Sequence, residues 1–106
     1  MIDSMKTAFC LKGKVAIITG GDTGIGFGIA TAFAELGADI AIFCRRADRA
    51  EEALEKLAPL GGVYKWYKTD ITDYENCKRS VDAVVADFGT VDILVNNGGV
   101  AQARPR

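Results

Sequence analysis

Four short runs rich in apolar and β-branched residues alternate along the chain with three runs of helical periodicity. This alternation is typical of a parallel sheet whose strands are joined by crossover helices. The strands are expected over residues 14–19, 39–44, 63–69 and 91–96. In the first of them, the stretch 15–18 is continuously apolar and suits burial on both faces of a sheet. The third contains lysines and is more polar, so it is expected near an edge.

Each expected helix has an apolar stripe and a stop signal. Gly37 ends the first stripe, whose members recur at spacings of four, four and three: Ile25, Ile29, Phe33 and Leu36. The second helix stops at Pro59 and the Gly61-Gly62 turn, after Ala53, Leu54 and Leu57. The third begins with Thr72 and Glu75 in capping-box spacing. Its apolar side is expected to be Cys77, Val81, Val84, Val85 and Phe88.

These elements together predict an α/β fold, a partial Rossmann-type doubly wound parallel sheet built as β-α-β-α-β-α-β in one domain over residues 1–106. Right-handed crossovers with strand order 3-2-1-4 place the first two helices on one face and the third on the other. A ligand is expected where the strand order reverses, beyond the carboxyl ends of the first and fourth strands. Residues 19–26 and 96–99 both fall there.

Composition excludes several other classes of function. The chain has 106 residues and a formal net charge of -1, so it lacks the basic surface typical of proteins that bind nucleic acid or anionic membranes. We expect neither as a partner. The segment before Lys14 lacks the hydrophobic region of a signal peptide. Three separated cysteines and no histidine predict neither a zinc site nor a disulfide framework, and we expect a cytoplasmic protein.

Glycines are concentrated between the first strand and the first helix, where residues 19–26 read T-G-G-D-T-G-I-G. In that position backbone N–H groups and the helix dipole can bind a pyrophosphate, which glycine allows to come close. The spacing from Gly20 is G-x-x-x-G-x-G, and Gly24, Gly26 and Gly28 also satisfy a looser G-x-G-x-G. The alternative is a glycine-rich turn without a ligand. The order of strand, turn and helix favours the dinucleotide site.

The end of the second expected strand bears on the choice of dinucleotide. NAD sites usually have an acidic residue about 20 positions after the glycine loop, where it binds the ribose 2′-hydroxyl. Here that position is Cys44, followed by Arg45 and Arg46, whose guanidinium groups suit a 2′-phosphate. The pattern favours NADP, with NAD as the second choice. Alternatively, the two arginines only flank the start of a surface helix.

Nearly the whole chain resembles the short-chain dehydrogenase/reductase family. The family's T-G-x-x-x-G-x-G loop matches residues 19–26 without a gap. Its aspartate after the third strand matches Asp70, which Ile71 follows, and its N-N-A-G motif matches residues 96–99 except for Gly98 in place of alanine. The opening residues and the loop are most similar to gluconate 5-dehydrogenase and related sugar-acid reductases. The 3-oxoacyl-carrier-protein reductases are similar too.

The resemblance implies roles in binding the nicotinamide dinucleotide. Asp22, Thr23 and Ile25 would line the pyrophosphate. Asp70 and Ile71 would contact adenine, although Asp70 alternatively flanks the third helix beside its cap. The adjoining ribose would lie against the residues after the fourth strand, and two further residues would brace the loop and that strand: Thr19 and Asn97. The expected cofactor-binding residues are Gly20, Asp22, Thr23, Gly24, Ile25, Gly26, Arg45, Arg46, Asp70, Ile71, Asn96 and Gly98.

By the same resemblance, hydride transfer between NADP(H) and an alcohol or carbonyl substrate needs a serine and a tyrosine followed four residues on by lysine. None can be placed after the fourth strand, so no catalytic residue is assigned. We expect the 106-residue chain alone to be inactive and its full-length form to be a homo-oligomer. Tyr64 and Lys68 have the tyrosine-lysine spacing, but they belong to the third expected strand, away from the reversal of strand order.

Two other functions compete with this interpretation. One is a noncatalytic dinucleotide-binding regulatory module. The other is an S-adenosylmethionine methyltransferase that uses Gly24, Gly26 and Gly28. The methyltransferase is disfavoured because the ribose-binding acid expected after the second strand is absent.

Overall fold

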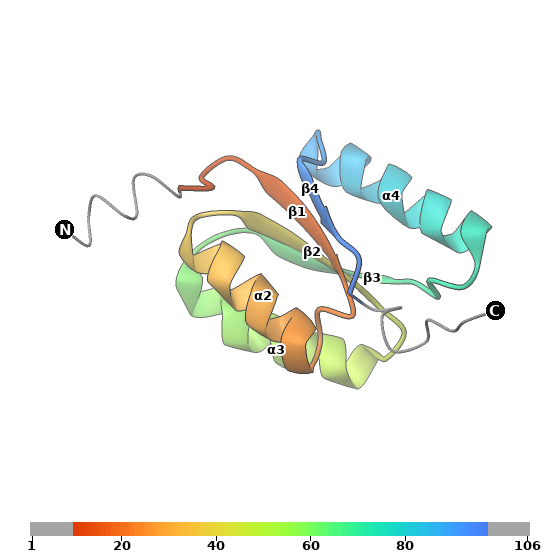
Figure 1. The fold of residues 1–106 in the computed structure, drawn as a ribbon, viewed down its shortest axis with the longest axis horizontal. Helices are drawn as coiled ribbons and strands as arrows, with labels where there is room; N and C mark the ends of the chain where they lie inside the picture. Colours follow the sequence, from red (N-terminus) through yellow and green to blue (C-terminus); the bar gives the residue numbers. More distant parts are fainter. Residues whose placement is uncertain (1–9, 98–106) are drawn as a thin grey trace.

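A computed structural model describes residues 10–97 of the chain. Strands and helices alternate throughout this part of the chain (Figure 1). The strands are β1 (Val15–Thr19), β2 (Asp39–Cys44), β3 (Tyr64–Lys68) and β4 (Ile93–Val95). The helices are α2 (Gly24–Glu35), α3 (Ala47–Leu57), the short 3-10 helix η1 (Ala58–Leu60) and α4 (Tyr74–Phe88). No helix among the described residues is long and apolar enough to cross a membrane.

The four strands form one parallel sheet in the order β3-β2-β1-β4, as predicted. In the register, Ile17 of β1 lies between Ala41 of β2 and Leu94 of β4. All five residues of β1 are buried, because this strand has a neighbour on each side and helices on both faces. The more polar strand β3 lies at the edge of the sheet, which confirms the expectation from its sequence.

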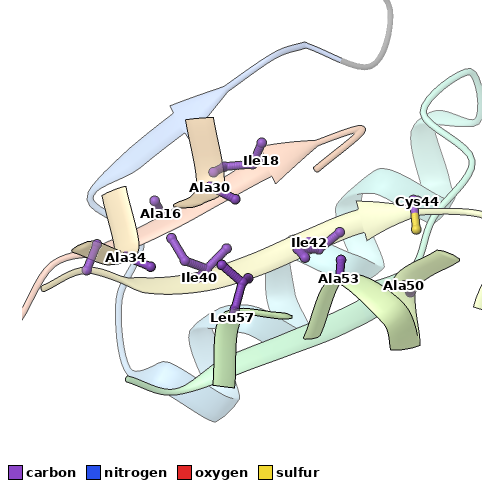
Figure 2. Close-up of a cluster of buried hydrophobic side chains, with 11 residues drawn as sticks. Ala16, Ile18, Ala30, Ala34, Ile40, Ile42, Cys44, Ala50, Ala53 and Leu57 are labelled. Carbon is purple, nitrogen blue, oxygen red and sulfur yellow. The ribbon is translucent and has the colours of Figure 1, made fainter. Parts of the chain in front are cut away.

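The helices cover the two faces of the sheet unequally. Helices α2 and α3 lie on one face and α4 lies alone on the other, as the right-handed crossovers predict (Figure 1). Alternate side chains of each strand therefore enter different cores. Figure 2 shows Ala53 and Leu57 of α3 beside the isoleucines of β2. The opposite core contains Val15, Ile17, Ala41, Phe43 and Val84.

Two expectations about α4 are wrong. The helix is capped by Asp73, whose carboxylate accepts a hydrogen bond from the Asn76 backbone N–H at 3.1 Å, and not by a Thr72–Glu75 capping box. The hydroxyl of Thr72 donates instead to the Asp70 carboxylate. Val85 was expected on the buried side of α4, but it is 45% exposed, whereas Val84 is fully buried. The core beneath α4 is formed by Val84, with Val81 and Phe88 packed against it, and Val85 lies outside this contact.

The core makes a prediction about stability. Leu57 of α3 is fully buried against the sheet, so Leu57→Ala should lower the free energy of unfolding by about 2 to 5 kcal/mol. Urea unfolding followed by circular dichroism measures this change. Leu60 is 38% exposed, and Leu60→Ala is the matched control, with an expected cost of about 0.5 kcal/mol. Equal costs for the two variants would contradict this packing.

Candidate functional site

The glycine loop is held closely against its surroundings. The Gly20 N–H donates to the Phe43 carbonyl at 2.8 Å, which ties the loop to the end of β2. A Cβ atom on Gly26 would collide with the Gly20 carbonyl and would lie 2.7 Å from the side-chain nitrogen of Asn97. Only glycine at position 26 therefore lets the first turn of α2 lie directly against the loop.

The N-terminus of α2 faces open space. Its capping residue, Thr23, is extended and makes no side-chain hydrogen bond to the helix, and the first turn contains no acidic residue. The N–H groups of that turn and the positive end of the helix dipole are thus available to an anion. Gly24 has a φ of +58°, and a Cβ there would meet no atom within 4 Å. A phosphate group could approach the backbone from this side.

The ends of β1 and β4 are joined beside the loop. The Thr19 hydroxyl lies 3.4 Å from the Val95 carbonyl and 3.4 Å from the Asn96 side-chain oxygen. Asn96 is exposed, and Asn97 lies against Gly26 on the other side of the loop. This geometry suits the bracing role expected of Thr19 and Asn97. Gly98 lies outside the described residues, so its expected contact with the ribose stays a prediction.

Cys44 is buried at the carboxyl end of β2. Burial, with the negative charge of Asp22 as the second cause, raises the pKa of its thiol to about 11. The thiol is therefore uncharged at neutral pH, and its sulfur lies 3.7 Å from the Arg46 carbonyl. A neutral, buried thiol is a poor acceptor for a ribose hydroxyl. The structure thus places no strong acceptor at position 44.

Both arginines after β2 are exposed and lie near carboxylates. Arg46 makes a two-point contact with Asp48, with nitrogen–oxygen distances of 3.2 and 2.9 Å. Hydrogen bonding to Asp48 is the main cause that raises the pKa of Arg46. Arg45 lies 3.9 Å from an oxygen of Asp70, a long and exposed contact that contributes little stability. The sequence interpretation missed Asp48. An acidic residue in the first turn of a helix is favoured by the helix dipole, and this position of Asp48 could have indicated it.

Asp70 lies in the turn between β3 and α4. One of its oxygens accepts hydrogen bonds from the Thr72 hydroxyl at 2.6 Å and the Thr72 N–H at 3.0 Å, and these lower the pKa of its carboxyl. The Asp70 N–H donates to the Asn76 side chain at 2.8 Å, a contact that the sequence interpretation missed. The other oxygen faces Arg45. The turn thus presents Asp70 and the half-buried Ile71 near the end of β2, and their contact with adenine stays a prediction.

A hollow of about 220 Å³ lies between the loop and α3, lined by Asp22, Thr23, Gly24, Phe27, Glu52, Ala53 and Lys56. A larger hollow of about 370 Å³ lies at the other end of the sheet, beside residues 34–37 and 60–62. Ligands of open α/β sheets bind beyond the carboxyl ends of the strands, so the smaller hollow belongs to the candidate site. Among the described residues, no three His, Cys, Asp or Glu side chains gather as a metal site.

Comparison with known proteins extends over almost the whole chain. The family model described as short chain dehydrogenase matches residues 14–106. D-threitol dehydrogenase from Mycolicibacterium smegmatis is 42% identical over 97 residues, which cover 92% of this chain and 37% of that protein. The chain therefore spans little more than a third of the length of this relative.

Two solved structures of similar fold carry different nicotinamide cofactors. The crystal structure of NAD+-bound xylitol dehydrogenase has a TM-score of 0.82 and 34% identity, covering 90% of this chain and 39% of that one. L-sorbose reductase from Gluconobacter frateurii, complexed with NADPH and L-sorbose, has a TM-score of 0.82 and 37% identity. The match covers 91% of this chain and 39% of that one. Relatives that share this fold therefore bind either kind of dinucleotide.

The geometry of the loop makes a prediction about binding. Gly24→Val should weaken binding of both NAD and NADP by about tenfold or more, because a branched side chain would occupy the space that a phosphate must enter. Titration calorimetry measures both affinities. Gly28→Ala is the matched control, since a Cβ at this exposed helical position meets nothing within 4 Å and should leave binding unchanged.

The Gly24→Val variant has two effects, backbone strain from valine at a positive φ and loss of phosphate binding. A second variant distinguishes them. Asparagine tolerates a positive φ, so the Gly24→Asn variant should fold. Its side chain would still occupy the space for the phosphate, so it should bind NAD and NADP more weakly than the unaltered chain does. Circular dichroism establishes that each variant is folded. Unchanged affinities in a folded Gly24→Val or Gly24→Asn protein would show that the loop does not hold the phosphates.

Proposed function

Because the chain belongs to the short chain dehydrogenase family, we propose that it forms the NADP(H)-binding part of an oxidoreductase acting on a polyol or a keto sugar. The observation that carries this proposal is the uncapped N-terminus of α2 behind a glycine loop that admits no side chain at Gly26. Such a terminus binds the pyrophosphate through backbone N–H groups and the helix dipole. A bound nicotinamide would supply the hydride chemistry.

The charges after β2 support NADP as the preferred cofactor. Position 44 carries a neutral thiol where an NAD site usually has an acid, and two exposed guanidinium groups follow it. A guanidinium can bind a phosphate through two parallel hydrogen bonds. The 2′-phosphate would compete with Asp70 for Arg45, and that contact is long enough, at 3.9 Å, to be given up readily.

The substrate class is inferred from the names of the relatives. D-threitol and xylitol are polyols, and L-sorbose is the matching kind of keto sugar. A sugar acid, which is the expectation from sequence, carries a carboxylate and stays an alternative substrate class. No catalytic residue is proposed within the described part of the chain. Tyr64 begins the edge strand β3 and its hydroxyl accepts a hydrogen bond from the Gly62 N–H, at the end of the sheet away from the glycine loop.

The preference for NADP can be measured directly. Arg45→Ala should weaken NADP binding by about tenfold to a hundredfold, because a charge-assisted hydrogen bond is lost, and should leave NAD binding nearly unchanged. Fluorescence titration with NADPH and NADH gives both affinities. Arg79→Ala, which removes the same charge from α4 on the other side of the sheet, is the matched control. Equal affinities of the unaltered chain for the two cofactors would contradict the preference.

A further inference from the structure

We propose that the outer edge of β4 is a docking surface for a second copy of this chain, which pairs its own β4 there in the antiparallel direction about Leu94. This inference goes beyond the proposed function and does not depend on it. It rests on the unequal chemistry of the two edges of the sheet, on the exposure of Leu94 and on the residue pairs that a two-fold axis produces.

The two edges of the sheet differ in chemistry. Strand β3 forms one edge and carries two exposed lysines, Lys65 and Lys68, which oppose pairing with a further strand. Strand β4 forms the other edge and consists of Ile93, Leu94 and Val95 alone. Among residues 10–97 it pairs only with β1, so its outer side has no strand partner there. The sheet is thus protected at β3 and can be extended at β4.

Leu94 is the side chain that such an extension would bury. Ile93 and Val95 are half-buried and pack against the core beneath α2 and α3. Because side chains alternate along a strand, Leu94 lies on the other face, which carries α4. It is 62% exposed there, since the core beneath α4 is built on β1 and β2. Burying this leucine removes apolar surface from water and stabilises the pairing.

A second copy of β4 complements this edge residue by residue. A two-fold axis at Leu94 places that residue opposite its own copy and Ile93 opposite the second copy's Val95. Apolar side chains that lie directly opposite each other stabilise a strand pair. The same register places the carboxylate of Asp92 opposite the amide of Asn96, which can donate a hydrogen bond to it. No like charges therefore meet over residues 92–96.

The pairing joins two four-stranded sheets into one. Because the two copies run in opposite directions, their glycine loops lie at opposite ends of the joined sheet. Strand β4 is only three residues long, so the contact is small. Interfaces that bury less than about 1,200 Å² are usually weak and transient. We therefore expect a reversible dimer with a dissociation constant on the order of 100 μM.

Sedimentation velocity tests the association. Between about 10 and 500 μM the 106-residue chain should shift from monomer towards dimer. Leu94→Lys should keep the chain monomeric over this range, because it places two lysines opposite each other at the axis. Leu60→Lys is the matched control, since Leu60 is also exposed but lies on η1, which leads to the other edge strand. This control should dimerise as the unaltered chain does.

Cysteine crosslinking locates the contact. Directly opposite residues of an antiparallel pair have Cα atoms about 4.5 to 5.5 Å apart, within the range of a disulfide. In a Cys10→Ser background, which removes the exposed native thiol, Leu94→Cys should give a disulfide-linked dimer and Leu60→Cys should not.

Circular dichroism establishes that each variant is folded, and the crosslinking decides the matter should the lysine variant not fold. A chain that stays monomeric at every concentration would overturn the proposal. Association that persists in a folded Leu94→Lys protein, or equal crosslinking at positions 94 and 60, would overturn it as well.

Discussion

The contact between Gly26 and the Gly20 carbonyl is the constraint on which the rest of the site depends. It brings the first turn of α2 directly onto the loop that leaves β1. The Gly20 N–H holds the same loop to β2, and Asn97 closes it from the side of β4. The carboxyl ends of three strands are thereby fixed around one helix N-terminus. A side chain at position 26 would separate them.

Two electrostatic features follow from this arrangement. The uncapped start of α2 offers partial positive charge to a pyrophosphate. Two small residues of the same helix, Ala30 and Ala34, are buried against the sheet (Figure 2). The end of β2 carries mixed charge, because Arg45 and Arg46 lie beside the carboxylates of Asp70 and Asp48. In the proposed function, the first feature binds the pyrophosphate of the dinucleotide and the second sets which dinucleotide is preferred.

The sequence predicted the architecture well because burial on both faces leaves continuous apolar strands, and crossover handedness then limits the topology to the observed order. The sequence did not predict which residue caps α4. Thr72 and Asp73 are adjacent, and either side chain can cap a helix. In the folded turn the Thr72 hydroxyl donates to the Asp70 carboxylate, which leaves Asp73 as the cap. The sequence interpretation also missed the partners of the arginines. The Arg45–Asp70 contact depends on the distance between side chains of separate elements, which residue spacing does not contain. Asp48, by contrast, lies only two residues after Arg46, and its place in the first turn of α3 was a signal in the sequence.

We propose that a dinucleotide binds at the carboxyl ends of the strands, across the glycine loop. A heteronuclear NMR titration of the nitrogen-15-labelled chain with NADPH tests it most directly, because each backbone amide reports separately. Binding there should give the largest shift changes at residues 20–26 and 44–46, around the uncapped start of α2 and the end of β2. Shift changes confined to residues 34–37 and 60–62, around the hollow at the opposite end of the sheet, would contradict it.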